Sequence, residues 1–337
     1  MNRFLKVSLS LCLIIFTLFS LCACGSGVEN KETTAPSVET TAKFSIGVIQ
    51  TDDTTEALEA YNGFIRAFSE KGYKENEYYN ISVRDCNNSA EECENAALDF
   101  VDAKVDVIFT FDVMATLAAK KSTKDIPIIF CGVYDPIESG ILDSCEKPEG
   151  NVTGVSDFTP VKGQFEFIKK ILPDAKKVSS LYMSTDENSV MVSSLAEVEA
   201  EAVGVEYSPF GVTDEKQLKK ELKTIFKDTD ALYLCEDEVT LENADAIIKA
   251  ANKAKVPIFS STDSFMSFGT FATCLPDYED LGYNAGELAL ICLKDIHPVS
   301  NISVEYAVKY KEYVSESVAK ALGITVEESD TLTLLDN

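Results

Sequence analysis

The chain has 337 residues, of which 45% are hydrophobic and 26% are charged, and this composition excludes a disordered or collagen-like protein. Its 30 basic and 56 acidic residues give a formal net charge of −26, which repels phosphate backbones and argues against nucleic acid as a partner. The one histidine, His297, removes most catalytic dyads and His-rich zinc sites, and we interpret it as a surface or packing residue.

The first 23 residues have the pattern of a secretory signal. Two basic residues precede an apolar run from Val7 to Leu21, which is short for a membrane-spanning helix. The following Leu-Cys-Ala-Cys resembles the lipobox of bacterial lipoproteins, in which cleavage leaves a lipid-bearing cysteine. We therefore predict lipidation of Cys24 and a flexible tether over residues 24–43. The alternative is an uncleaved anchor helix, and both interpretations place the remaining chain outside the cytoplasm.

Seven cysteines follow Cys24 without a C-x-x-C pair, and they are Cys86, Cys93, Cys131, Cys145, Cys235, Cys274 and Cys292. An odd, scattered set favours buried small hydrophobic side chains over a disulfide framework. A Cys86–Cys93 disulfide remains an alternative.

Strands and helices alternate along the mature chain. In its first half, apolar and β-branched runs predict strands at 44–49, 81–85, 105–110 and 126–130, with helices at 55–71, 91–102 and 113–121. In its second half we expect strands at 178–182, 230–234 and 256–259, with helices at 189–203 and 240–253. Both halves contain an aspartate-led strand, a helix ending in Ala and Lys, and then an apolar residue, Pro and Ile.

This repetition predicts right-handed βαβ units in two Rossmann-like α/β lobes with parallel sheets. We expect a multi-segment hinge with crossings near 154–157, 276–278 and 307–311. The first lobe then comprises 44–154 and 278–307, and the second comprises 155–277 and 308–330.

Ligands of open parallel sheets bind beyond the carboxyl ends of the strands, so two such lobes predict a cleft that closes about a small polar or zwitterionic ligand. The residues that follow the strands are Gln50 to Asp52, Phe111 and Asp112, Tyr134 and Asp135, Glu236 to Glu238, and Ser260 to Asp263. Any one of them is equally interpretable as a helix cap or turn residue. The predicted ligand-contacting residues are Gln50, Thr51, Asp112, Tyr134, Asp135, Ser156, Asp157, Asn188, Asp237, Glu238, Asp263 and Tyr278.

Catalytic motifs are missing from the sequence. It contains no G-x-S-x-G, no G-x-x-x-x-G-K-[ST] and no G-x-G-x-x-G, and one histidine cannot form H-E-x-x-H. We predict no catalytic residue, cofactor or metal ligand. An enzyme that uses paired surface carboxylates is the remaining catalytic alternative.

Several segments from Phe44 to about Glu327 resemble the substrate-binding lipoproteins of ABC transporters, in the branch with tryptophan- and aromatic-amino-acid-binding members. The resemblance is carried by 124–130 (KDIPIIF), Asp135-Pro136, 150–157 (GNVTGVSD), Gln164, 171–177 (ILPDAKK), Asn188-Ser189, 269–272 (GTFA), Tyr278, Gly282 and Gly286. It implies a periplasmic-binding-protein-like fold of the first type. It also implies capture of a solute and its delivery to a membrane permease powered by a separate ATPase. We expect a monomer that is lipid-anchored on the extracytoplasmic face of the cell membrane.

The chain departs from the family pattern where the ligand is expected. Val113-Met114 replaces a Thr-Pro pair, Tyr134 replaces a Thr, and Asp237-Glu238 replaces an Asp-Asn pair. A receptor-linked ligand sensor is an alternative that the sequence does not separate from transport.

Five acids in the strand-end loops favour a ligand with a cationic group, since buried carboxylates need partners. They are Asp112, Asp135, Asp237, Glu238 and Asp263. We predict an amino acid, an aromatic one first, with its ammonium on Asp135, its carboxylate at the helix N-terminus after Asp112, and Tyr134 and Phe111 stacked on its side chain. A sugar or nucleoside is the alternative ligand, and a turn cap is the alternative role of Asp135.

Overall fold

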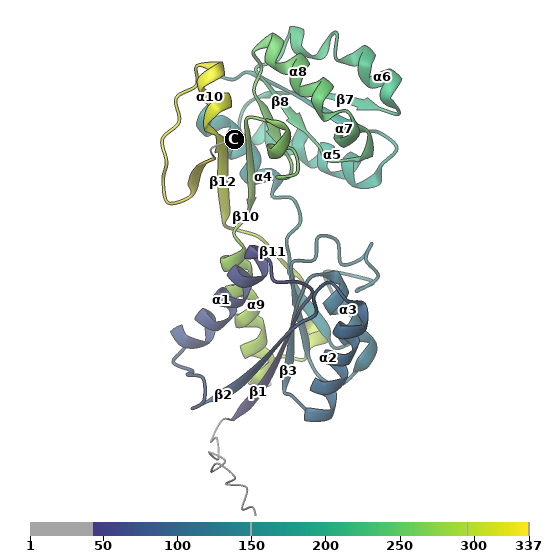
Figure 1. The fold of residues 1–337 in the computed structure, drawn as a ribbon, viewed down its shortest axis with the longest axis vertical. Coiled ribbons are helices and arrows are strands. Elements are labelled where there is room, and N and C mark those ends of the chain that lie inside the picture. The colour runs from purple at the N-terminus through teal and green to yellow at the C-terminus, as the bar shows by residue number, and fades with distance from the viewer. Residues whose placement is uncertain (1–42, 149, 295, 336–337) are drawn as a thin grey trace, which may run out of the picture. The chain divides into compact units, whose positions relative to one another are not determined.

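The computed structural model describes residues 43–148, 150–294 and 296–335, which form two α/β lobes, each built on one sheet (Figure 1). The first sheet has the strand order β11-β5-β4-β3-β1-β2, and the second has the order β13-β12-β10-β9-β8-β6-β7. Only β12 runs antiparallel to its neighbour β10 among the strand pairs that the structure describes. The predicted α/β fold with two mostly parallel sheets is confirmed.

The first lobe has helices on both faces of its sheet. Its strands are β1 (Phe44–Gln50), β2 (Tyr79–Asp85), β3 (Val107–Phe111), β4 (Ile128–Cys131), β5 (Val152–Ser156) and β11 (Glu305–Tyr306), and its helices are α1 (Thr55–Glu70), α2 (Ala90–Ala103), α3 (Val113–Ser122), α9 (Tyr278–Leu293) and the short η3 (Val299–Asn301). Successive side chains of a strand point to opposite faces, so Val107 and Phe109 pack with α1 and α9, whereas Ile108 packs with α2 and α3. This explains why the inner strands β3 and β4 are apolar along almost their whole length.

The second lobe repeats this arrangement. Its strands are β6 (Lys177–Met183), β7 (Glu206–Val212), β8 (Ala231–Leu234), β9 (Ile258–Ser260), β10 (Ala272–Pro276), β12 (Tyr310–Ser315) and β13 (Leu332–Leu335). Its helices are α4 (Val161–Ile171), α5 (Glu187–Ala202), α6 (Glu215–Glu221), α7 (Glu238–Glu242), α8 (Ala244–Ala254) and α10 (Glu316–Leu322), with short turns η1 (Ile225–Lys227) and η2 (Met266–Phe268). Tyr233 packs with α4 and α5 on one face, and its neighbours Leu232 and Leu234 pack with α8 on the other.

The two halves of the chain share one topology. The order β5-β4-β3-β1-β2 in the first sheet corresponds strand for strand to β10-β9-β8-β6-β7 in the second. The repeated unit that the sequence indicates is therefore present in both lobes.

One predicted helix, over 240–253, is wrong as a single element. The structure has two helices there, because Asn243 leaves the helical conformation, with φ −111° and ψ 17°. Its side-chain amide donates to the carbonyl of Val239 at 2.9 Å. Asparagine side chains offer the backbone such alternatives to helical hydrogen bonds.

The chain passes between the two sheets three times, after Ser156, between Pro276 and Tyr278, and between Tyr306 and Tyr310. Strand β5 stays in the first sheet to Ser156, past the predicted lobe boundary at 154, and β13 extends to Leu335, past the predicted end at 330. The lobe boundaries and the use of these passages as a hinge remain predictions.

The signal segment, Cys24 and all of the tether except Lys43 lie outside the described residues. Within the described ranges, every helix is too short or too polar to span a membrane.

Candidate ligand-binding site

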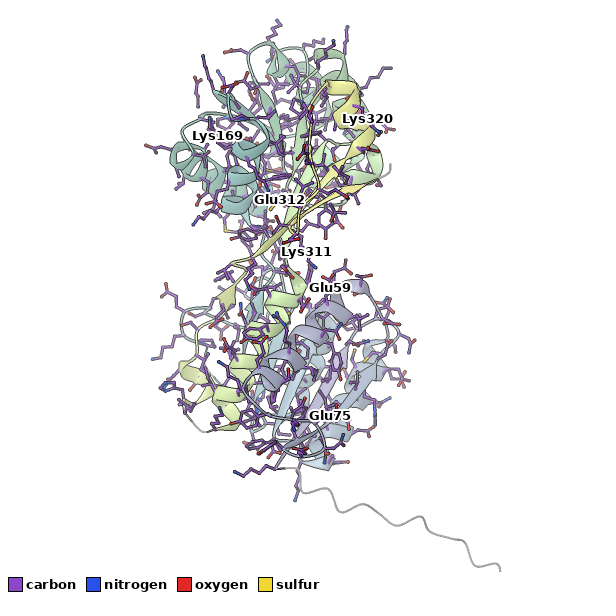
Figure 2. The ribbon with its side chains drawn as sticks, turned by 90° about the vertical axis from the view of Figure 1, so that its left-hand side faces the viewer. Glu59, Glu75, Lys169, Lys311, Glu312 and Lys320 are labelled. Carbon is purple, nitrogen blue, oxygen red and sulfur yellow. The ribbon has the colours of Figure 1, made fainter. Side chains whose placement is uncertain are left out.

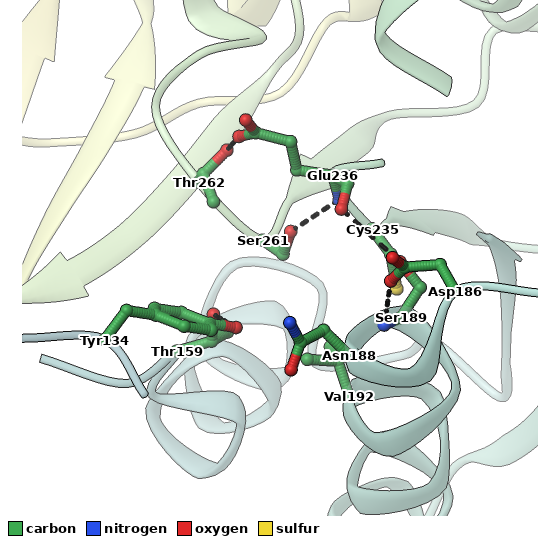
Figure 3. Close-up of a pocket in the computed structure, with 10 residues that line it drawn as sticks. All are labelled: Tyr134, Thr159, Asp186, Asn188, Ser189, Val192, Cys235, Glu236, Ser261 and Thr262. Atoms are coloured by element: carbon green, nitrogen blue, oxygen red, sulfur yellow. Dashed lines mark hydrogen bonds between the residues drawn. The ribbon is translucent and has the colours of Figure 1, made fainter. Parts of the chain in front are cut away.

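Two adjoining cavities lie at the carboxyl ends of strands from both sheets. The first, here called the Asn188 cavity, has a volume of about 290 Å³ and is lined by Tyr134, Thr159, Asp186, Asn188, Ser189, Val192, Cys235, Glu236, Ser261 and Thr262 (Figure 3). The second, called the Asp157 cavity, has a volume of about 300 Å³ and is lined by Glu56, Tyr134, Asp157, Thr159, Pro160, Ser261, Thr262, Asp263, Leu275, Pro276 and Tyr278. Four residues are common to both, namely Tyr134, Thr159, Ser261 and Thr262.

Asp157 is the carboxylate with an unmet hydrogen-bonding capacity in this site. It follows β5 directly, and its Oδ2 accepts a hydrogen bond of 2.9 Å from the hydroxyl of Tyr278. Its Oδ1 is buried and has no hydrogen-bond partner in the part of the chain that the structure describes. Burial raises the pKa of the Asp157 carboxyl, and the negative charge of Asp112 acts in the same direction. Hydrogen bonds from Tyr278 and from the backbone N–H of Asp157 itself oppose this only in part.

Tyr278 begins α9 and forms a wall of the Asp157 cavity. Its ring lies 6.0 Å from that of Phe111, edge to face. Burial is the largest cause of the raised pKa of its phenol, followed by the negative charge of Asp157. The hydroxyl therefore stays protonated and acts as a donor to the carboxylate.

Tyr134 is held in place through its hydroxyl, its ring and its backbone carbonyl. Its hydroxyl shares a hydrogen bond of 2.9 Å with Oγ1 of Thr159, and its ring centre lies 4.9 Å from that of Phe158. Its backbone carbonyl accepts a hydrogen bond of 2.8 Å from Oγ of Ser156, which also accepts from the N–H of Phe158 at 3.1 Å. Ser156 therefore holds Tyr134 in place and lines neither cavity.

The N-terminus of α5 forms one side of the Asn188 cavity. Asp186 caps this helix by accepting from the N–H of Ser189 at 2.7 Å. The amide of Asn188 donates to Oε2 of Glu138 at 2.7 Å. In the view of Figure 3, Asn188 lies between Tyr134 on one side and Asp186 and Ser189 on the other.

The opposite side of the Asn188 cavity is built from residues that follow β8 and β9. Oγ of Ser261 accepts from the N–H of Glu236 at 3.0 Å, and the hydroxyl of Thr262 donates to the Glu236 carboxylate. Figure 3 shows both contacts. The hydrogen of the Ser261 hydroxyl is left available to a ligand oxygen.

The charge around the two cavities has one sign. Their lining includes five acids, Glu56, Asp157, Asp186, Glu236 and Asp263, and no lysine, arginine or histidine. Such a lining favours a ligand with a cationic group and disfavours a purely anionic one.

Five of the predicted site residues line these cavities: Tyr134, Asp157, Asn188, Asp263 and Tyr278. Asp135 does not, because it caps a turn in which its Oδ1 accepts from the N–H groups of Ile137 at 2.8 Å and Glu138 at 2.9 Å. This contact corresponds to the alternative role that the sequence left open for it.

Three further predicted acids line neither cavity: two of them cap helices and the third is exposed. Asp112 caps α3 with an unusual φ of 81°. Asp237 caps α7 and accepts from the N–H of Met183 at 2.7 Å, and Glu238 is exposed. Gln50 and Thr51 end the β1 strand region without lining either cavity.

The predicted ligand contacts omit the other lining residues, among them Thr159, Asp186, Ser189 and Val192. Glu236, Ser261 and Thr262 were expected at strand ends but not as ligand contacts. The sequence carries a signal for two of the omitted residues, because Asp186 and Ser189 are polar residues that follow the strand expected at 178–182. Thr159 precedes α4, a helix that the sequence patterns did not indicate.

The cysteines of the described residues are free thiols, and Cys86 and Cys93 are buried in mutual hydrogen-bond contact. Cys235 lines the Asn188 cavity, and burial raises the pKa of its thiol, which disfavours the thiolate. No group of three or more His, Cys, Asp or Glu side chains in the described ranges is arranged to hold a metal ion.

Comparison with known proteins identifies a family match over residues 45–333, to the family described as ABC transporter substrate binding protein. A curated relative, the tyrosine-binding protein of Clostridioides difficile (strain R20291), is 32% identical over 305 residues, which cover 90% of this chain and 86% of the relative.

Two solved structures share the fold over most of both chains. One is the ligand-free, open structure of a substrate-binding protein with adhesive properties from Clostridium difficile, with a TM-score of 0.72, 27% identity, and coverage of 87% of this chain and 99% of that chain. The other is an ABC domain in complex with L-Trp from Streptococcus pneumonia, with a TM-score of 0.54, 25% identity, and coverage of 85% and 97%.

Proposed function

Because the chain belongs to the family of ABC transporter substrate-binding proteins, we propose that it captures an aromatic amino acid in the joined Asp157 and Asn188 cavities. The observation that carries this proposal is the Asp157 carboxyl: it lines a cavity whose charged residues are all acidic, and its buried Oδ1 has no hydrogen-bond partner among the described residues. This ligand class agrees with two relatives, one described as a tyrosine-binding protein and one solved in complex with L-Trp.

The α-ammonium group of an amino acid is the partner that Asp157 lacks. A buried carboxylate without a full set of hydrogen bonds is unfavourable, and an ammonium donates three N–H groups to such oxygens. In this proposal the ammonium supplies the hydrogen-bond donors that water supplies to this carboxylate in the unfolded chain. This assigns to Asp157 the role that the sequence suggested for Asp135, whose Oδ1 already accepts two backbone hydrogen bonds.

The rest of an aromatic amino acid also finds suitable groups in the site. The hydroxyl of Ser261 and the amide of Asn188 are donors for the carboxylate, and both line the Asn188 cavity. The rings of Tyr134 and Tyr278 line the Asp157 cavity and offer stacking surfaces for the ligand ring.

In this proposal the protein works outside the cytoplasm, as a monomer, and hands its ligand to a membrane permease driven by a separate ATPase. A diacylated Cys24 would anchor it stably, whereas one acyl chain would hold it only marginally. Replacing Cys24 with Ala should release the protein into the medium or leave it unprocessed. Unchanged fractionation and migration of that variant would contradict the anchor.

The ligand is tested by calorimetric titration of the soluble chain with L-tyrosine, L-tryptophan and L-phenylalanine. We expect binding tighter than about 1 mM, or roughly −4 kcal/mol. Asp157→Asn should weaken it at least about tenfold, which corresponds to about 1.4 kcal/mol.

Asp135→Asn is the matched control, since it alters a neighbouring strand-end acid outside both cavities. Its affinity should stay close to that of the wild type. Loss of binding in Asp135→Asn with none in Asp157→Asn would restore Asp135 as the ammonium partner. No binding of any of the three amino acids to the wild type would refute the ligand class.

A further inference from the structure

We propose that the ring of Tyr134, a residue that lines both polar cavities and a third, apolar one, separates them and so sets the size of the ligand side chain. This inference rests on the proposed function, since it concerns which amino acid the same site accepts. It assigns Tyr134 a selective role in addition to the stacking contact that its ring offers.

The apolar cavity has a volume of about 370 Å³ and is lined by Tyr134, Asp135, Pro136, Ile137, Cys145, Phe158, Met191 and Tyr306. Tyr134 lines all three cavities, and no other lining residue of the apolar cavity belongs to either polar cavity. This shared lining places Tyr134 at the boundary between them.

The contacts of Tyr134 make it a fixed wall and not a freely rotating side chain. The hydroxyl is held by Thr159 at 2.9 Å, and the ring packs against Phe158 at 4.9 Å. Rotation of the ring would break the first contact and disrupt the second. Burial raises the pKa of the phenol, so the hydroxyl remains neutral and keeps its hydrogen bond.

The apolar cavity exposes hydrophobic side chains that a ligand could cover. Ile137, Met191 and Tyr306 line it and are 51%, 40% and 48% exposed. A ligand ring placed there would cover part of this surface, which is favourable. With Tyr134 present, a ligand held by its ammonium at Asp157 can extend its side chain only within the polar cavities.

Shortening residue 134 should therefore join the apolar cavity to the site and favour larger aromatic side chains. The test is calorimetric titration of the wild type, Tyr134→Ala and Tyr134→Phe with L-tyrosine and L-tryptophan, comparing the ratio of the two dissociation constants. We expect Tyr134→Ala to shift this ratio at least tenfold in favour of L-tryptophan. Tyr134→Phe keeps the ring and should retain the wild-type ratio.

Two further variants control for folding and for general loosening of the region. Tyr134→Thr is a second shortened side chain, in case the alanine variant fails to fold, and it should shift the ratio in the same direction. Tyr306→Ala enlarges the apolar cavity but leaves the wall, so its ratio should remain that of the wild type.

The possible failures are distinguishable. An unchanged ratio in folded Tyr134→Ala and Tyr134→Thr overturns the role of Tyr134 while leaving amino-acid binding intact. An equal shift in Tyr134→Phe also overturns it, because a ring that is still packed against Phe158 would then fail to act as a wall. If the wild type binds neither amino acid, the proposed function fails, and the selective role fails with it.

Discussion

Tyr278 donates a hydrogen bond of 2.9 Å to Asp157, and the two residues lie on different passages of the chain between the sheets. Asp157 follows β5, whereas Tyr278 begins α9 just after β10. A cation bound at Oδ1 of Asp157 would therefore contact a group that is connected to both passages. Through this hydrogen bond, ligand binding at Asp157 would be coupled to both passages and thus to the arrangement of the two lobes.

Ligand-induced closure is the first prediction. Small-angle scattering of the soluble chain should give a smaller radius of gyration with saturating L-tyrosine or L-tryptophan than without it, because a ligand contacted from both lobes selects the closed state. Asp157→Asn at the same ligand concentration should give the ligand-free profile. Identical profiles for the wild type with and without a ligand shown to bind would refute closure.

The second prediction is a pH dependence of ligand affinity. Asp157 must be ionised to pair with an ammonium, and its pKa in the ligand-free protein is raised by burial. Affinity should therefore fall as the pH drops through this raised pKa, and binding in that window should release protons, since the ammonium lowers the pKa again. Titrations in buffers of different ionisation enthalpy measure this release.

The same shift has the opposite effect on the stability of the ligand-free protein. A folded-state pKa above the unfolded value means that the contribution of Asp157 is most favourable below the unfolded pKa and is lost as the pH rises through the folded pKa. Asp157→Asn should remove both dependences. A proton release that persists in this variant would point to another carboxylate.

The third prediction separates structural from ligand-binding acids. Asp237 accepts from the N–H groups of Met183 at 2.7 Å and Thr240 at 2.8 Å, both within the second lobe. Asp237→Ala leaves these buried donors without a partner, so we expect the free energy of unfolding to fall by about 3 kcal/mol. Its exposed neighbour provides the control, because Glu238→Ala should change stability by less than about 0.5 kcal/mol. Denaturant titration measures both.

The sequence patterns were sufficient for the alternating α/β architecture because inner strands such as β3, β4 and β8 are buried on both faces. They did not predict the strands β5, β7 and β10 or the helices α4 and α9. Continuous apolar runs such as 128–131 can be recognised without knowledge of their neighbours, and their repetition in the second half predicts the second sheet. The break at Asn243 was not predictable in this way. It depends on the amide of Asn243, which donates a hydrogen bond to the backbone carbonyl of Val239 instead of to solvent.

The assignment of the acidic residues shows why the site was harder to predict. Asp135 and Asp157 both follow strands and look equivalent in the sequence. They differ in the donors around them: Asp135 accepts from two turn N–H groups, whereas Oδ1 of Asp157 has no hydrogen-bond partner among the described residues. Those donors are positioned by the fold, so a list of acids cannot distinguish a cap from a ligand contact.

The fourth prediction concerns an ion pair between the lobes. Nζ of Lys311, on β12, lies 2.8 Å from Oε2 of Glu59, on α1, and 3.7 Å from Asp277 (Figure 2). Both side chains of the closer pair are about one-third exposed or less, at 29% and 33%. Glu59→Gln should lower the free energy of unfolding by roughly 0.5–1 kcal/mol, with a smaller effect in high salt.

An exposed pair on one helix is the control for this variant. Lys320 and Glu316 of α10 are 2.8 Å apart, with 70% and 39% of their side chains exposed. Glu316→Gln should therefore cost less, about 0.3 kcal/mol. Equal effects of the two substitutions would show that the Lys311–Glu59 contact contributes nothing specific between the lobes.

The last prediction concerns the contact between α1 and α9, the helix that begins with Tyr278. Gly282 lies so close to α1 that a Cβ atom there would be 1.9 Å from the carbonyl oxygen of Ala60. Two effects of Gly282→Ala oppose each other, because alanine favours a helix over glycine by about 1 kcal/mol. Overpacking costs typically 1–3 kcal/mol and more against rigid backbone, so we expect a net loss of about 2 kcal/mol. Asn284→Ala, on the same helix, supplies the propensity change without the clash and should be neutral or slightly stabilising. If denaturant titration shows Gly282→Ala to be as stable as Asn284→Ala, the two helices separate more easily than their packing indicates.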